Sequence, residues 1–429
     1  MYDLVVIGAG WAGFSASIRA KEMGLKVALI ERKEVGGTCL NLGCIPTKSL
    51  IHAARIFDLV NKSSDFGVIS SKPSLNFLKV LSRKDRTVDS LRSGMVFMLK
   101  GIDLFKGEPR IISAQDIVID GRVIKTRFII VATGSKPLEL KGFEFDYKKV
   151  LSSNEALALK EAPSSLLVIG GGAIGCEFAN LFSTFGSHVT IIEREKQLLP
   201  GEDSDIAFKL EAIFKKNGIN VKTGVNELSV NKQDYNLILV CIGRVADTNI
   251  PGLKELGVKL DRGRVITDDY LKTDVDNIYA AGDCTSRIML AHLSGYQGRA
   301  AVENIFNDAE KQKAYPLNIP NCIFTNPEIS SSGLNIEQAR KEEIKIDIRK
   351  FDFMASGMAR ILDETRGFLK IISDSTTGAI LGFSMIGPSA AEIAGLLSLA
   401  ISCRLKVKDI KATVFAHPSI SEAIGEALK

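Results

Sequence analysis

The sequence lacks a long apolar run: no stretch approaches the roughly 18 uninterrupted apolar residues of a transmembrane helix. It also lacks the basic segment and cleavage site of a secretory signal, since Met1 leads directly into the apolar run Leu4–Ile7. Charge of one sign is not concentrated: the net charge is +5, and acidic and basic residues are interleaved along the chain. These absences predict a cytoplasmic globular protein that binds neither membranes nor nucleic acid.

Cysteine is scarce, with seven residues among 429. An odd, sparse set argues against a framework of structural disulfides and indicates that any disulfide is catalytic. Cys39 and Cys44 lie five positions apart in the segment GGTCLNLGCIPTK, a spacing that suits neither a zinc site nor the C-x-x-C of thioredoxin-like proteins. We therefore expect no metal, and two alternatives stay open for this pair: buried core thiols or a working redox centre.

A dinucleotide-binding pattern opens the chain, whose length predicts two to four domains. Asp3–Gly13 reads as an apolar strand that enters a glycine turn, followed by a helix over Ala12–Met23 and a second strand, Val27–Ile30, that ends in Glu31. In this fingerprint the glycines permit the tight turn, the approach of the pyrophosphate and the packing of helix on strand. The glycines are Gly8, Gly10 and Gly13.

The same pattern recurs at Leu166–Glu193, where the strand His188–Ile192 ends in Glu193. In both copies 23 positions separate the first glycine from the terminal acid. Two copies in the required context favour two nucleotide sites over two ordinary strand–helix turns. Glu193 would repel a 2′-phosphate, which favours NAD over NADP, although Arg194 and Lys196 follow it directly. The glycines of this copy are Gly170, Gly172 and Gly175.

Further motifs make the whole chain resemble a known family. They are GGTCLNLGCIPTK at Gly36–Lys48, ATGS at Ala132–Ser135, AGD at Ala281–Asp283 and HPSISE at His417–Glu422. Together with the two fingerprints, these motifs resemble the flavin-dependent pyridine nucleotide–disulfide oxidoreductases, and within that family the dihydrolipoamide dehydrogenases. The resemblance implies an α/β fold with two Rossmann-like domains, for FAD and NAD, and a C-terminal α+β dimerisation domain. The implied boundaries are 1–147 and 273–314 for the FAD domain, 148–272 for the NAD domain and 315–429 for the dimerisation domain.

The resemblance also assigns roles to the cysteine segment. It implies that Cys39 is the interchange thiol that meets substrate, that Cys44 lies against the flavin, and that Lys48 pairs with Glu177 beside the flavin ring. FAD is expected in the first fingerprint and NAD in the second. Taken together, the expected cofactor contacts are Gly8, Gly10, Gly13, Glu31, Gly37, Thr38, Lys48, Thr133, Gly134, Gly170, Gly172, Gly175, Glu193, Gly243, Gly282 and Asp283.

The geometry of disulfides adds a constraint on this segment. Residues five apart in a regular helix are separated by about 7.5 Å of rise, whereas a disulfide needs Cα atoms about 4.4–6.8 Å apart. The segment is therefore expected to bend, with Gly43 supplying the freedom. A nearby helix start and cofactor would lower a thiol pKa. The other cysteines are expected to be structural: Cys176, Cys241, Cys284, Cys322 and Cys403.

A general base is expected near the C-terminus, because histidine suits removal of a thiol proton near neutral pH. Pro418 would begin a helix at its first position, and Glu422, about one turn inside, would orient His417. In the family this histidine serves the disulfide of the partner subunit, which implies a homodimer. Packing roles are expected for His52, His188 and His292.

These patterns predict an NAD-dependent enzyme that oxidises the dihydrolipoyl group of a 2-oxoacid dehydrogenase or glycine cleavage complex. The alternatives are a reductase of another small disulfide and a flavoprotein subunit that acts mainly in complex assembly. The sequence departs from the common family pattern at four places: Trp11, the short segment between Gly224 and Gly243, the segment Gly243–Thr248, and Phe415.

Overall fold

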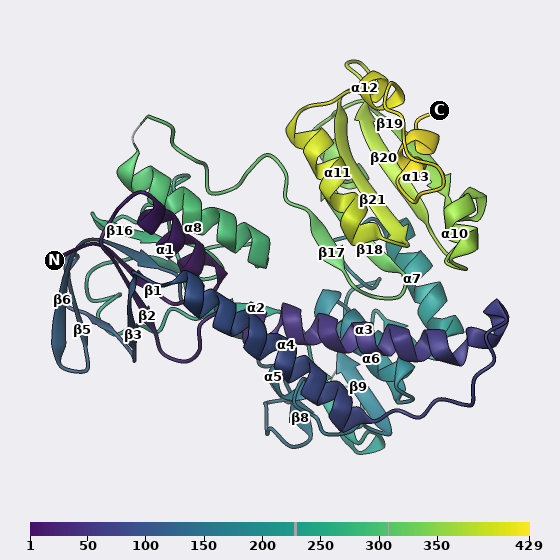
Figure 1. Ribbon diagram of the computed structural model, residues 1–429, viewed down its shortest axis with the longest axis horizontal. Helices are drawn as coiled ribbons and strands as arrows, with labels where there is room; N and C mark the ends of the chain where they lie inside the picture. Colours follow the sequence, from purple (N-terminus) through teal and green to yellow (C-terminus); the bar gives the residue numbers. More distant parts are fainter. Residues whose placement is uncertain (227–229, 308) are drawn as a thin grey trace. The chain divides into compact units, whose positions relative to one another are not determined.

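The computed structural model describes residues 1–226, 230–307 and 309–429, and Figure 1 shows the course of the chain. The chain divides into two compact units, each made from three segments. The first unit comprises Met1–Ser49, Leu78–Leu138 and Gly243–Pro316, and the second comprises Leu50–Phe77, Glu139–Ile242 and Leu317–Lys429. The predicted boundaries at residues 147, 272 and 314 stay a prediction. No helix in the described ranges combines the length and apolar character needed to span a bilayer.

The first unit contains a sheet of order β3-β2-β1-β6-β5-β4, with β16 paired to β6. Its parallel strands are β1 (Tyr2–Ile7), β2 (Val27–Glu31), β3 (Asp103–Lys106), β6 (Arg122–Val131) and β16 (Ile278–Ala280). An antiparallel extension consists of β4 (Arg110–Ile111) and β5 (Asp116–Ile119). Smaller pairs are β7 (Ser135–Pro137) with β13 (Arg244–Ala246) and β14 (Leu260–Asp261) with β15 (Arg264–Val265).

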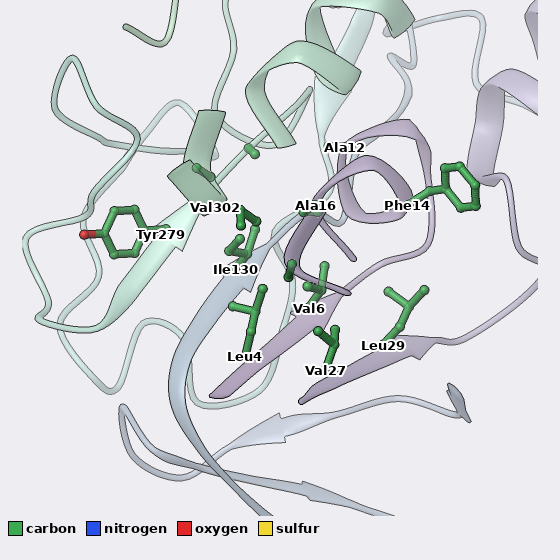
Figure 2. Close-up of a cluster of buried hydrophobic side chains, with 14 of the residues drawn as sticks. Leu4, Val6, Ala12, Phe14, Ala16, Val27, Leu29, Ile130, Tyr279 and Val302 are labelled. Carbon is green, nitrogen blue, oxygen red and sulfur yellow. The ribbon is translucent and has the colours of Figure 1, made fainter. Parts of the chain in front are cut away.

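Both faces of this sheet are buried, as is usual for parallel strands. Leu4 and Val6 of β1 point into one core and Val5 and Ile7 into another. The helices α1 (Trp11–Glu22) and α8 (Ala291–Phe306) cover the first face, and Figure 2 shows the side chains that meet there. The two helices approach closely, because a Cβ on Gly298 of α8 would lie 2.1 Å from the Ala12 carbonyl oxygen of α1.

The second unit contains two sheets. The first is parallel with order β11-β10-β9-β12-β8 and repeats the strand–helix–strand start of the first unit. Its strands are β8 (Val150–Leu151), β9 (Ser165–Ile169), β10 (His188–Glu193), β11 (Asn220–Thr223) and β12 (Leu237–Val240). Its helices are α5 (Ser153–Ala156), α6 (Ala173–Thr184) and α7 (Ser204–Lys216). The segment between Gly224 and Gly243, noted as short in the sequence, includes residues outside the described ranges.

The second sheet of this unit is antiparallel, with order β17-β18-β21-β20-β19. Its strands are β17 (Asn321–Ile323), β18 (Glu328–Gly333), β19 (Ile346–Asp352), β20 (Phe368–Asp374) and β21 (Ile380–Gly387). The helices α11 (Ala390–Ser402) and α13 (Glu422–Ala427) share its core. The predicted fold class, two Rossmann-like sheets and a C-terminal α+β part, is therefore confirmed.

Candidate functional site

The two glycine turns have nearly the same geometry. Gly8 and Gly170 both have a φ of +103°, a conformation that glycine adopts readily. A Cβ on Gly13 would lie 1.7 Å from the Gly8 carbonyl oxygen, and a Cβ on Gly175 would lie 1.9 Å from that of Gly170. No side chain fits at these contacts, so the third glycine of each pattern lets helix pack on strand, as predicted.

In each unit the glycine turn places the N-terminus of a helix at the edge of the sheet where the parallel strands end. The residue before α1 is Gly10, with φ −70° and ψ −175°, and the residue before α6 is Gly172, with φ −73° and ψ −175°. The first N–H groups of both helices have no partner within their helix, and they favour an anionic ligand such as a pyrophosphate.

The two terminal acids bind the turns directly, a role that the sequence pattern does not reveal. Glu31 Oε2 accepts a hydrogen bond from Ala9 N at 2.7 Å, and Glu193 Oε2 accepts one from Gly171 N at 2.6 Å. Each acid also accepts an N–H bond two residues further along the chain, at 2.7 and 2.8 Å. The carboxylates are therefore held in place before any ribose binds.

A polar cluster in the first unit lies where β6 and β16 end. Ser135 Oγ donates to Asp283 Oδ2 at 2.5 Å, and Ser294 Oγ donates to Asp283 Oδ1 at 3.2 Å. Arg244 donates from Nε to Ser135 Oγ at 2.8 Å and from Nη2 to the Ser135 carbonyl at 2.7 Å. Burial lowers the pKa of Arg244, while Asp283 and Cys44 oppose that shift. Arg244 is not among the site residues predicted from the sequence, although it directly follows Gly243.

This edge fits a flavin nucleotide. Within the described residues, the buried Thr133 Oγ1 has no hydrogen-bond partner, and a buried hydroxyl normally has one. Gly134 has a φ of +75°, and a Cβ there would meet no atom of the described residues within 4 Å. Three groups therefore lie at this edge of the sheet: the Thr133 hydroxyl, the Asp283 carboxylate and the N-terminus of α1. Each of them matches a polar group of a bound nucleotide.

The cysteine segment is anchored to the first glycine turn. The Gly36 N–H donates to the Ala9 carbonyl at 2.8 Å. A Cβ on Gly37 would lie only 2.7 Å from Gly10 Cα, so the two backbones touch. The cysteine segment is therefore held directly against the first glycine turn.

The predicted bend between the two cysteines is confirmed. The helix α2 (Gly37–Leu42) ends before Gly43, and α3 (Cys44–Asn61) begins directly after it. Gly43 has φ −146° and ψ −114°, and a Cβ there would lie 2.9 Å from the Thr38 carbonyl oxygen. The break places Cys44 at the N-terminus of α3, where the helix dipole favours negative charge.

No disulfide joins any of the seven cysteines, all of which lie in the described ranges. A hydrogen bond with the Cys44 thiol raises the pKa of Cys39, burial raises it further, and Trp11 and Lys48 lower it. The cause is the neighbouring sulfur, because Cys39 keeps its proton to donate it to Cys44, and a second negative charge beside the first is costly. The expectation that a helix start and a cofactor lower a thiol pKa stays a prediction.

The predicted partners Lys48 and Glu177 belong to different units, and their pairing stays a prediction. Lys48 lies in the second turn of α3, in the same unit as both cysteines. Glu177 lies in α6, is 5% exposed, and accepts a hydrogen bond from Phe324 N at 2.9 Å. This buried carboxylate, in the second turn of α6, therefore has an ordered hydrogen-bond partner.

His417 and Glu422 meet, but the local structure differs from the expectation. His417 Nδ1 lies 2.8 Å from Glu422 Oε1, and Glu422 Oε2 accepts from Ser419 N at 2.8 Å. The helix begins at Glu422, not at Pro418. Residues 416–419 form a turn instead, in which Ser419 Oγ donates to the Ala416 carbonyl at 2.6 Å, and such side-chain bonds compete with helix formation.

The remaining histidines lie in regular elements: His52 in α3, His188 at the start of β10 and His292 in α8. Phe415, which departs from the common pattern, packs against α13, since a Cβ on Gly425 would lie 3.1 Å from its ring. In the first unit the structure brings together the first glycine turn, both cysteines, Lys48 and Asp283. In the second it brings together the second turn with Glu193, and separately the His417–Glu422 pair.

Comparisons with known proteins match the whole chain. The family model described as pyridine nucleotide-disulphide oxidoreductase matches residues 2–298, and the dimerisation domain of that family matches residues 319–428. The chain is 39% identical over 447 positions to a dihydrolipoyl dehydrogenase of Chlamydia muridarum, covering 99% of this chain and 96% of that protein. It is 35% identical over 460 positions to a dihydrolipoyl dehydrogenase of Bacillus subtilis, covering 99% and 97%.

Two solved structures share the fold along the entire chain. The HOCl-induced flavoprotein disulfide reductase RclA from Escherichia coli is 28% identical with a TM-score of 0.88, covering 100% of this chain and 99% of that chain. LpdA from Mycobacterium tuberculosis is 24% identical with a TM-score of 0.91 over 100% and 99%. The chain therefore belongs to the pyridine nucleotide-disulphide oxidoreductase family, whose members are enzymes that bind FAD and a pyridine nucleotide.

Proposed function

We propose that this enzyme oxidises a dihydrolipoyl group with NAD⁺, through Cys39, Cys44 and FAD. The observation that carries the proposal is the hydrogen-bonded Cys39–Cys44 thiol pair, anchored to the nucleotide turn by the contact of Gly37 with Gly10. Its full-length relatives at 35–39% identity include dihydrolipoyl dehydrogenases. The lipoyl group would belong to a 2-oxoacid dehydrogenase or glycine cleavage complex.

The residues that would hold FAD are those of the first unit. The N–H groups at the start of α1 would bind the pyrophosphate, Glu31 a ribose hydroxyl, and Thr133 and Asp283 further hydroxyl or ring atoms. When bound there, FAD supplies a two-electron acceptor between the dithiol and the pyridine nucleotide. Gly134, Gly282 and Lys48 would complete its surroundings.

The chemistry of the thiols follows from disulfide exchange. In the oxidised enzyme, a substrate thiolate attacks Cys39 Sγ, the Cys39–Cys44 bond breaks, and its electron pair moves to Cys44. His417 of the partner subunit takes the proton of the second substrate thiol, which then attacks the substrate sulfur bound to Cys39. The substrate leaves as a disulfide, and the enzyme retains two electrons as a dithiol.

The second unit would supply the pyridine nucleotide site and part of the dimer. Glu193 carries a fixed negative charge beside the glycine turn, which supports NAD over NADP. Gly170, Gly172 and Gly175 would line this site, whereas Gly243 belongs to the first unit. Residues 319–428 match the dimerisation domain of the family, which supports a homodimer with His417 serving the opposite subunit. Glu177 would pair with Lys48 to balance the charge that arises beside the ring.

A second candidate is the reduction of another small disulfide, in the opposite direction. The likeness to the disulfide reductase RclA, with 28% identity and a TM-score of 0.88, supports it. A mainly structural role in a complex is disfavoured, because the His417–Glu422 pair and the thiol pair are both intact.

A steady-state comparison separates these candidates. The purified yellow protein should reduce NAD⁺ with dihydrolipoamide, and Cys44→Ser should abolish this activity. Cys403→Ser, at an exposed cysteine outside the site, is the matched control and should leave the rate unchanged. Turnover with NADPH and glutathione disulfide alone would show that the proposed substrate is wrong.

A further inference from the structure

Trp11 is the only tryptophan of the chain and occupies an unusual position. It is the first residue of α1, directly after the glycine turn, and its side chain is 40% exposed. One edge of the ring is fixed by Phe14, one turn further along α1, with ring centroids 6.0 Å apart and an interplanar angle of 65°. Phe14 itself is buried in the core drawn in Figure 2. The indole is therefore oriented by the core while much of its surface faces outward.

The backbone brings this indole to Cys39. Gly10 touches Gly37, and Ala9 accepts the Gly36 N–H at 2.8 Å, so the chain before Trp11 is locked to the chain before Cys39. Trp11 directly follows one of these touching glycines, and Cys39 lies two residues after the other. From this position the Trp11 side chain reaches the Cys39 sulfur, and its hydrogen bond there lowers the pKa of Cys39.

We propose that Trp11 is a positioning residue of the redox centre, whose indole N–H stabilises Cys39 when that sulfur carries the negative charge. The indole has one donor and no acceptor. It therefore stabilises the thiolate without competing with His417 for the substrate proton. The proposal extends the function proposed above, but it concerns Cys39 itself and holds for any dithiol or disulfide substrate.

The N–H acts where Cys39 is the leaving group. When the second substrate thiolate attacks, the bond between the first substrate sulfur and Cys39 Sγ breaks, and its electron pair moves to Cys39. The indole N–H donates to this thiolate until the thiolate takes up the proton held by the partner subunit's His417. A leaving thiolate that is better stabilised departs faster. Without the donor, this step slows although both cysteines and the base are intact.

The experiment measures the Cys39 thiolate directly. The FAD-containing enzyme, in a Cys403→Ser background, is reduced with dithionite and alkylated with iodoacetamide, and the labelled peptide containing Cys39 is quantified by mass spectrometry. Trp11→Phe removes the donor. Replacement of Trp11 by 3-benzothienyl-L-alanine removes only the N–H and keeps the shape that contacts Phe14.

Both variants should show a pH profile of Cys39 alkylation shifted upward by about one unit, because a hydrogen bond to a charged group contributes about a tenfold change in thiolate population. At a fixed pH below the midpoint, the rate should fall about threefold, since the more basic thiolate is also the better nucleophile. Wild-type rates and an unshifted profile for the benzothienyl variant would overturn the proposal.

A second readout uses the sole tryptophan. The emission of Trp11 in the reduced wild-type enzyme should titrate with the same midpoint as the alkylation of Cys39, and Cys39→Ser should remove that titration. An emission midpoint that differs from the midpoint of Cys39 alkylation would contradict the contact between Trp11 and Cys39. These results separate the two proposals. If alkylation is slowed in the Trp11 variants but the wild-type enzyme does not turn over dihydrolipoamide, only the proposed substrate is refuted. If alkylation is normal in the variants and the wild-type enzyme turns over dihydrolipoamide, only the role of Trp11 is refuted.

Discussion

His417 Nδ1 lies 2.8 Å from Glu422 Oε1, in a turn that the Glu422 carboxylate also closes by accepting the Ser419 N–H. The His417 side chain is 79% exposed. The hydrogen bonds from Ser419 and His417 lower the pKa of Glu422, so the carboxylate is charged across the neutral range. A charged acceptor on Nδ1 fixes the tautomer of the ring and leaves Nε2 for proton transfer.

Glu422→Gln should therefore lower kcat with dihydrolipoamide by about 10- to 100-fold, because the neutral amide does not stabilise the imidazolium. Wild-type activity should also fall as the pH drops through the lowered pKa of Glu422, since protonation removes the same charge. A pH series of kcat/KM for both proteins measures this. Glu426→Gln, on the same helix but paired with Lys429, is the control and should behave as wild type. An unchanged kcat in Glu422→Gln would contradict the assigned role.

Glu193→Gln should relax the choice of pyridine nucleotide. The amide retains one oxygen for the Gly171 N–H but loses the charge that repels a 2′-phosphate. We expect the ratio of kcat/KM for NADP⁺ to that for NAD⁺ to rise by about tenfold or more. Glu195→Gln, an exposed acid two residues along, should leave the ratio unchanged. An equal rise of this ratio in both variants would mean that the ratio depends on the overall charge of this region and not on the position of Glu193.

Two glycines of the second turn should respond differently to alanine. A Cβ on Gly175 would lie 1.9 Å from the Gly170 carbonyl oxygen, so Gly175→Ala should destabilise the fold by about 3 kcal/mol or more. A Cβ on Gly172 would meet no described atom within 4 Å, so Gly172→Ala should cost about 1 kcal/mol at most.

The added methyl at Gly172 would instead face the pyrophosphate, and we expect KM for NAD⁺ to rise by about tenfold. Denaturant melts and NAD⁺ titrations of both variants test the pair. Normal NAD⁺ binding by Gly172→Ala would show that the pyridine nucleotide does not lie against this turn.

Glu202 should make stability depend on pH. Burial raises the pKa of this carboxyl, although Asn321 and Ser331 donate hydrogen bonds to it at 2.8 and 3.0 Å. A carboxyl whose pKa is raised on folding contributes stability at low pH and loses it as the pH rises through the folded value. Glu202→Gln keeps an acceptor and cannot ionise, so its melting temperature relative to wild type should rise as the pH increases from the ordinary carboxyl range through the raised pKa of Glu202.

Glu161→Gln, at an exposed carboxylate of the same unit, is the matched control for this series. Its melting temperature should follow that of the wild type at each pH. A constant difference between Glu202→Gln and wild type across the series would mean that Glu202 has the same pKa in the folded and unfolded chain.

The two nucleotide turns, the strands around them and the break at Gly43 could all be predicted from the sequence. These features depend on contiguous residues: a glycine with positive φ, an apolar strand and a helix start specify one another within about 30 positions. For the same reason the resemblance to the family could be recognised from short motifs.

The way in which distant segments act on the site depends on the tertiary fold and could not be predicted from the sequence. The hydrogen bonds from Arg244 to Ser135 and from Ser135 to Asp283 join strand ends far apart in the sequence. The donation from Trp11 to Cys39 depends on two glycine backbones in contact, and the raised pKa of Cys39 depends on a second sulfur and on burial. Hydrogen bonds and desolvation act over a few ångströms in space, and no spacing along the chain reports which groups come that close.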